Sequence, residues 1–305
     1  FFYLSDVNMN DNDYGSTFGL DYGYSRPGIY INRYPNTGIT WMHTRQYNLG
    51  VDLTLFKNLD MVIELYKRST DNILMTRSYI PNSMGLMSTP EANTGKAENR
   101  GIDFLASYKA TLGKHTWLET RVNLTYATSK TLVYDEPIYP DNLSYLTHVG
   151  YPVDQVFGYI ADHLFIDDAE VKNSPTQTFG EYMAGDLKYR DVNGDGSINQ
   201  NDLVPIGYPL TPEIIYGSRF SFGYKKFDIT AFFQGSARSS FWINPENISP
   251  FVINGDYQNN LLKAVAEDHW SENNRNSYAF WPRLSDRFIG NNNQTSTWWM
   301  EDGTF

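Results

Sequence analysis

Along several stretches of this chain every second residue is apolar, and that alternation predicts β-strands. Over 47–55, apolar side chains recur at odd positions from Tyr47 to Leu55, and the residues between them are polar or small. A period of two places the two sets on opposite faces of a strand. The same period recurs in 18–24, 61–68, 102–110, 118–126, 216–224 and 227–234, and it is least regular in 61–68. The pattern therefore predicts an all-β chain.

Short and very long connections alternate between the predicted strands. Turn signals at Asn58, Gly113 and Lys225 mark the short connections. The long connections, rich in Pro, Asn, Gly or Trp, cover 70–99, 131–212 and 235–305. Long strands with tight turns at one end and long loops at the other are typical of outer-membrane β-barrels. A soluble β-sandwich also alternates, but its strands are usually only about five or six residues long, so the layout favours an antiparallel transmembrane barrel.

Composition and charge narrow the function classes. The 35 acidic residues outnumber the 24 basic ones, giving a formal charge of −11. This argues against a nucleic-acid partner, because phosphate binding needs a basic face. Cysteine is absent, which excludes a disulfide scaffold and a thiolate metal site. No run of about 18 apolar residues occurs, so the sequence predicts no transmembrane helix.

The segment Asp191–Asp202, within the long connection 131–212, matches the spacing of a calcium-binding loop. Side-chain or carbonyl oxygens fall at the six ligand positions, which are Asp191, Asn193, Asp195, Ser197, Asn199 and Asp202. Gly196 stands where the template needs a sharp turn. Two departures are an Asp rather than a Glu at the last position and the lack of flanking helices, since Pro205 follows closely. The alternative is a run of Asx turns in which these side chains bond their own backbone.

Aromatic side chains in the Asn-rich connections are candidates for ligand contact. Aromatic rings beside amides suit stacking on sugars and hydrogen bonding to hydroxyls, and they suit peptides equally. The candidates are Trp242, Tyr257, Trp270 and Trp281. The alternatives are packing inside the loops or an interfacial aromatic girdle. The five histidines show no metalloprotease spacing and no G-x-S-x-G elbow occurs, so we expect no enzymatic activity.

Several ordered blocks resemble SusC-like TonB-dependent outer-membrane transporters, the SusC/RagA family. The block Gly185–Gly196 resembles the family's "G-D-x-k-Y-k-D-x-N-g-D-G" closely. Further blocks in the expected order are Trp41–Asp52 with its Gln46-x-Asn48-Leu49-Gly50-x-Asp52 core, Tyr66–Leu74, Asn93–Gly95, Glu98–Asp103, Phe157–Tyr159, Phe233–Ser236 and Trp281–Arg283. Asp103 replaces the Glu usual in the family. The resemblance covers nearly the whole chain.

The resemblance implies a role in active import across the outer membrane of a Gram-negative, Bacteroidetes-type bacterium. Family members form barrels of about 22 strands with an N-terminal plug. We therefore expect residues 1–305 to form the later-middle part of such a barrel, without the plug and final strands, and 131–212 to be a long extracellular loop. The implied partners are a SusD-like surface lipoprotein acting as a lid, the TonB–ExbB–ExbD complex and outer-membrane lipid. The implied cargo is an oligosaccharide or oligopeptide, with glycans preferred.

Other classes stay open on the sequence alone. A secreted glycan-binding or glycan-cleaving β protein with a dockerin-like calcium loop would be a water-soluble monomer. A diffusion porin would share the barrel but need neither lid nor TonB. The chain begins Phe1-Phe2-Tyr3 without a Met or a basic segment, so we expect a mature protein or a piece of a longer one.

Overall fold

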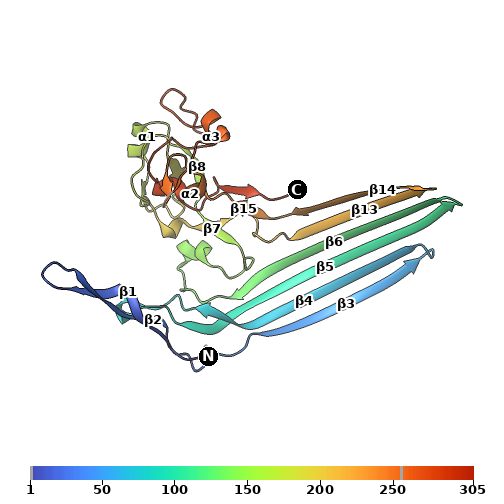
Figure 1. The fold of residues 1–305 in the computed structure, drawn as a ribbon, viewed down its shortest axis with the longest axis horizontal. Coiled ribbons are helices and arrows are strands. Elements are labelled where there is room, and N and C mark those ends of the chain that lie inside the picture. The colour runs from blue at the N-terminus through green and yellow to red at the C-terminus, as the bar shows by residue number, and fades with distance from the viewer. Residues whose placement is uncertain (1–2, 255–256) are drawn as a thin grey trace.

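One long antiparallel sheet of six strands dominates the computed structural model, which describes residues 3–254 and 257–305 (Figure 1). The strand order is β14-β13-β6-β5-β4-β3. The strands are β3 (His43–Leu55), β4 (Leu59–Thr76), β5 (Glu91–Gly113), β6 (Thr116–Val133), β13 (Ile214–Tyr224) and β14 (Phe227–Ala237). The structure confirms the all-β prediction and contains each of the last six predicted strands.

Tight turns close the sheet at one end, which we call the turn end. β13 and β14 are joined by Lys225 and Lys226 alone, and Lys225 takes a positive φ of 54°. β3 and β4 are joined by 56–58, where Phe56 and Lys57 have φ of 53° and 65°. These left-handed residues reverse the chain within two or three positions. Turns this short fix the register of the two strands that they join.

The strands run further toward the opposite, loop end than the alternation predicts. The prediction of a connection over 70–99 is wrong at its edges, because β4 continues to Thr76 and β5 begins at Glu91. Irregular pairing between Thr70 and Ile73 explains the miss, since it interrupts the period of two. The remaining connection holds the 3₁₀ helix η1 (Asn82–Met84).

The predicted strand at 18–24 is also wrong. A two-stranded hairpin forms there instead, from β1 (Asp6–Phe18) and β2 (Tyr24–Arg33). The residues between them turn, with Tyr22 at a φ of 54° and its N–H donating to the carbonyl of Gly19. The apolar residues of the predicted strand therefore flank and form a turn, because Phe18 ends β1 and Tyr24 begins β2.

The connections 134–213 and 238–305 fold together at the loop end into what we call the loop module. The first contains β7 (Val156–Gly158), β8 (Ala161–Leu164), α1 (Asp168–Asn173), β9 (Thr176–Gln177), β10 (Leu187–Tyr189), β11 (Ser197–Ile198) and β12 (Val204–Ile206), with 3₁₀ turns η2 (Asp141–Leu146) and η3 (Gln200–Asp202). The second contains β15 (Ser240–Trp242), α2 (Pro245–Ile248), β16 (Ile253–Asn254), β17 (Tyr257–Gln258), α3 (Lys263–Glu267), η4 (Gly290–Asn293) and β18 (Met300–Asp302). No helix in 3–254 or 257–305 is long and apolar enough to cross a membrane.

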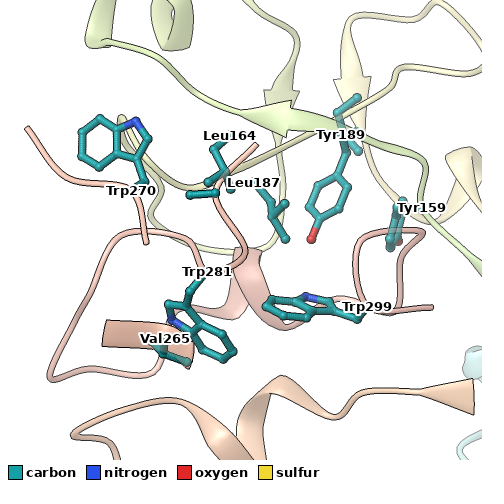
Figure 2. Packing of buried hydrophobic residues seen from close by; sticks show 10 residues of the cluster. Tyr159, Leu164, Leu187, Tyr189, Val265, Trp270, Trp281 and Trp299 are labelled. Atoms are coloured by element: carbon teal, nitrogen blue, oxygen red, sulfur yellow. The ribbon is translucent and has the colours of Figure 1, made fainter. Parts of the chain in front are cut away.

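The main hydrophobic core lies in the loop module, not on the sheet (Figure 2). The rings of Trp281 and Trp299 are 5.0 Å apart between centroids, and those of Tyr159 and Tyr189 are 5.5 Å apart. The cluster joins both connections and comprises Tyr159, Leu164, Leu187, Tyr189, Ile198, Val265, Trp270, Ala279, Trp281 and Trp299. Burial of this much aromatic surface makes the two connections one folded unit.

Candidate functional site

The two faces of the sheet have opposite chemistry. Cross-strand partners point to the same side, so the register assigns each residue to a face. One apolar row is Val51, Ile63, Phe104, Leu124 and Tyr216. On this apolar face Leu49 is 66% exposed and Phe227 is 81% exposed. Such an exposed apolar surface requires a non-aqueous neighbour.

The opposite, polar face carries charged and amide side chains. Asp103 accepts a hydrogen bond from the Thr125 hydroxyl at 2.7 Å, and Arg68 donates to Gln46 at 3.3 Å. Members of this face include Gln46, Asn48, Asp52, Glu64, Arg68, Asn99, Asp103, Arg121, Asn123 and Arg219. An alternation of apolar and polar faces with period two is what a barrel wall between lipid and an aqueous lumen requires.

A hollow of about 410 Å³ lies where the polar face meets the loop module. Its sheet side is formed by residues of β4, β5 and β6, including Tyr66, Thr70, Asn99 and Ser129. Its loop side is formed by Val153, Asp154, Pro209, Thr211, Pro212 and Glu213. The lining therefore offers hydroxyls, the Asn99 amide and two carboxylates beside one aromatic ring, a set of hydrogen-bonding groups suited to a polar oligomer.

Hydrogen bonds to the sheet hold the loop side of the hollow in place. The Val153 N–H donates to the Ser129 hydroxyl at 3.1 Å, and the Ala127 N–H donates to the Glu213 carbonyl at 2.8 Å. The Asp154 carboxylate accepts the Thr211 N–H at 2.7 Å. Because each of these bonds ties a loop to a strand or to another loop, the hollow is preformed.

An ion pair closes the edge of the hollow at Glu213. Its nearly buried carboxylate accepts from Arg238 Nε at 2.6 Å, and the Arg238 guanidinium lies 5.3 Å from the centroid of the Tyr208 ring. The hydrogen bond from Arg238 to the Glu213 carboxylate raises the pKa of the arginine. Since Glu213 is already neutralised, it adds little net negative charge to the lining.

A buried polar network joins the two halves of the loop module. Gln177 Nε2 donates to Asn291 Oδ1 at 2.6 Å, and the Tyr189 hydroxyl donates to the Asn291 carbonyl at 2.7 Å. Asn291 Nδ2 in turn donates to the Leu187 carbonyl at 2.8 Å. Burial raises the pKa of the Tyr189 hydroxyl, so it stays a donor. These bonds connect residues more than 100 positions apart and fix β10 against η4.

Asp186 is the buried charge of this network. It has no exposed surface, and its carboxylate meets Arg283 Nε at 2.9 Å and Asn292 Nδ2 at 2.7 Å. Burial raises the pKa of Asp186, and the Arg283 guanidinium opposes that rise. A buried carboxylate of this kind needs each of its partners, because an unpaired charge in a dry interior is costly.

The segment Asp191–Asp202 is held by its own side chains. The Asp191 carboxylate accepts the N–H groups of Gly194 at 2.7 Å and Gly196 at 2.8 Å. Asn193 and Asp195 each accept the N–H two residues further on. Among residues 3–254 and 257–305, no group of three or more His, Asp or Glu side chains is placed to hold a metal ion. The loop thus has the Asx turns of the alternative interpretation, and its carboxylates retain free lone pairs.

The last two ligand positions of the motif are also engaged. Asp202 is fully buried and accepts the N–H groups of Val192 at 2.8 Å and Asn199 at 2.9 Å. The Asn199 side chain caps η3 by accepting the N–H of Asn201 at 2.9 Å, while Asn199 Nδ2 donates to the carbonyl of Ser197 at 3.2 Å. Asp202 therefore closes the loop by binding its backbone from the buried side, whereas the calcium template expects the residue at this position to bind the ion.

Three of the four predicted aromatic contacts lie in or against the hydrophobic cluster of the loop module. Trp270 and Trp281 are 4% and 5% exposed and belong to the hydrophobic cluster. Trp242 is half-buried and packs against that cluster. The backbone of Tyr257 lies in β17, and its side chain lies outside the described part of the structure. Burial of Trp270 and Trp281 argues against their direct contact with a ligand and favours the packing alternative.

Sequence reasoning missed the residues that line the hollow and those that join the loop module. Asn99 and Thr70 fell in a segment predicted to be a connection. Gln177 and Asn291 sit in non-periodic segments, and their partners are too distant in sequence for a local pattern to reveal. The only available signal was the run of amides at 291–294.

Comparisons with known proteins agree with the sheet geometry. The sequence model of the family described as "TonB dependent receptor-like, beta-barrel" matches residues 10–208. The chain is 23% identical over 272 residues to TonB-dependent receptor P26 of Formosa agariphila, covering 84% of this chain and 26% of that protein. It is 26% identical over 221 residues to TonB-dependent receptor P3 of the same organism, covering 68% of this chain and 22% of that protein. The chain thus spans about a quarter of the length of these curated relatives.

Solved structures share the fold. The whole chain superposes on part of the "Structure of the RagAB peptide transporter" with a TM-score of 0.66 and 17% identity, covering 31% of that chain. The "open-open" state of the RagAB peptide importer gives a TM-score of 0.63 at 16% identity, covering 30% of that chain. At this identity the likeness concerns the fold.

Proposed function

The chain belongs to the TonB-dependent receptor-like β-barrel family, and on that premise we propose that its sheet forms part of the wall of an outer-membrane importer. The observation that carries the proposal is the register, which puts apolar rows on one face and polar rows on the other. The apolar face meets lipid and the polar face lines the lumen. The turn end faces the periplasm, and the loop module lies outside the cell.

The proposed activity is uptake of an oligomeric nutrient without chemistry on it. TonB, with ExbB and ExbD, supplies the energy, and a SusD-like lipoprotein closes the outer mouth. Among cargoes we favour glycans, because the hollow offers several hydroxyls and the Asn99 amide beside the Tyr66 ring. Oligopeptides are the second candidate, since the same groups bond a peptide backbone and the solved RagAB structures are titled as peptide transporters.

The membrane placement is tested by extracting the native protein from outer membranes in mild detergent and weighing the intact complex. A detergent-dependent assembly with a bound lipoprotein supports the proposal. A free, water-soluble species of the chain would contradict it and favour the secreted glycan-binding or glycan-cleaving protein instead.

The cargo is tested by uptake of labelled oligosaccharides and oligopeptides into whole cells. Asn99→Leu removes an amide from the lining of the hollow and should lower uptake. Asn48→Leu is the matched control, because Asn48 lies on the same polar face outside the hollow. Equal uptake by the two variants would contradict a role for the hollow. Uptake that persists without TonB would favour a diffusion porin.

We also propose that calcium stiffens the segment Asp191–Asp202. Oxygen ligands suit this hard cation. The side-chain oxygens of Asp191, Asn193 and Asp195 face the backbone of the same loop and keep lone pairs that a cation could use. The Ser197 carbonyl and Asn199 would complete the site, with Asp202 supporting it from the interior. Calcium should slow proteolysis of this segment in the parent, and Asp195→Ala should remove that protection. Equal cleavage of the parent with and without calcium would rule the site out.

A further inference from the structure

Basic side chains gather on the apolar face of the sheet just beyond its apolar rows, toward the loop end. Tyr47, Lys67 and Arg100 are cross-strand neighbours in one row of β3, β4 and β5. The next row on the same face holds Arg45 on β3 and Lys130 on β6. Rows on one face are about 7 Å apart. We call Arg45, Lys67, Arg100 and Lys130 the cationic collar.

The collar carries more positive charge than it can pair. Glu98 lies in the second row between Arg45 and Lys130, and it binds Lys67 at 2.8 Å and Arg100 at 2.5 Å. Across residues 3–254 and 257–305, Arg45 and Lys130 make no ion pair. Within the collar, four basic groups therefore share the Glu98 carboxylate, and Asp71 in the adjoining row interacts with Arg45.

The region is bounded on both sides. Toward the loops, the following row is balanced, because Lys96 pairs with Asp71 at 2.8 Å. Toward the turns, the face becomes apolar, and tyrosines mark its edge at Tyr47, Tyr126 and Tyr216. Tyrosine prefers the interface between hydrocarbon and headgroups. The collar therefore lies at headgroup depth, on the outward side of the wall.

We propose that the cationic collar binds the phosphate of a lipid headgroup in the outer leaflet. The inference rests on the proposed membrane placement. Arg and Lys are the side chains that bind phosphate oxygens, and Arg can do so with two parallel hydrogen bonds. The apolar rows directly below the collar receive the acyl chains of the same lipid. A protein partner fits less well, because it would have to displace lipid from the adjoining apolar rows.

The test uses the full-length protein in phosphatidylcholine nanodiscs. The probes are lipid A with its phosphates and lipid A stripped of them, and the readout is lipid bound per protein in a titration. Arg100→Gln with Lys130→Gln removes two collar charges and leaves Lys67 paired to Glu98. Lys114→Gln with Lys226→Gln removes two charges at the turn end and serves as the matched control. Each basic group near an anionic surface contributes about 1 kcal/mol, so the collar variant should bind phosphorylated lipid A about 30-fold more weakly.

The outcomes separate this inference from the proposed function. Weaker binding by the collar variant, with no change for the control or for stripped lipid A, supports the collar. Equal binding by parent and collar variant after normal insertion overturns the collar alone. Displacement of lipid A by equimolar inorganic phosphate would mean a free-anion site and would also overturn it. Failure of the parent to insert overturns the membrane placement and the collar together.

Discussion

Replacing Arg283 by Met should open the loop module, because it leaves the Asp186 carboxylate buried without its cation. Breaking a buried pair by removing one partner costs about 3–5 kcal/mol. Asp186 keeps two donors, Asn292 Nδ2 at 2.7 Å and the Met183 N–H at 2.9 Å. The lower end of that range, about 3 kcal/mol, therefore applies, and it raises the open population about 100-fold.

Limited proteolysis of the full-length protein in detergent measures this population. Cleavage follows the open fraction when opening and closing are faster than cutting. The double variant Asp186→Asn with Arg283→Met removes both charges and should recover most of the protection. If the cleavage rates of Arg283→Met and the parent agree within threefold, or if the double variant is cut faster than Arg283→Met, the ion pair does not hold the module closed.

The pH dependence gives an independent check on the same variant. Burial already raises the pKa of Asp186, and loss of Arg283 removes the group that opposes the rise. A carboxyl whose pKa is higher in the folded state is stabilising when protonated, so stability is lost as the pH rises through that folded value. The excess cleavage of Arg283→Met should therefore shrink as the pH falls below neutrality. An excess that stays constant with pH would contradict the electrostatic explanation.

Three further changes test other parts of the structure. Val51→Arg on the apolar face should cost about 2–4 kcal/mol of barrel stability near the bilayer midplane; a neutral effect on heat-modified gel mobility would mean that this face does not meet hydrocarbon. Gly158→Ala places a Cβ 2.6 Å from the Thr295 carbonyl oxygen and should cost about 1–3 kcal/mol, seen as faster proteolysis of the loop module, whereas Gly113→Ala meets open space and should be silent. Burial alone would raise the pKa of Glu170, but the Ile166 N–H, Lys188 and His163 lower it to about 2. The ionised Glu170 contributes fully to the free energy of unfolding above about pH 5, and this contribution is lost as the pH falls toward 2. Glu170→Gln should therefore lower the free energy of unfolding at pH 7 by up to about 3 kcal/mol and change it little at pH 2.

The sheet could be predicted from sequence where one face meets an apolar environment. Tyr47 to Leu55 alternate cleanly because every second side chain is apolar, and the structure places that set on one face. The same rule failed beyond the apolar rows, where Lys67 and Glu98 continue the strands with charged residues on both faces. Alternation reports burial and not backbone pairing, so it ends where the apolar environment ends.

The loop module could not be predicted, because its contacts join segments with no shared periodicity. Gln177 meets Asn291 across 114 positions, and neither lies in an amphipathic stretch. The motif Asp191–Asp202 was visible for a different reason, since its spacing is local. The conformation of this loop nevertheless depends on Asp202, which is buried and accepts the backbone N–H at the start of η3. Local spacing identified the loop but not the direction of its last side chain.

Two different environments stabilise the two halves of this chain. The loop module has its own core, in which Leu164, Leu187 and Ile198 are fully buried. The sheet has none on its apolar face, where Phe227 and Leu49 remain largely exposed. Hydrogen bonds between strands set the geometry of the sheet, but its apolar rows gain their stabilisation only when lipid or detergent covers them. Removing detergent should therefore aggregate the protein through the sheet, while the tryptophans of the loop module keep their native fluorescence.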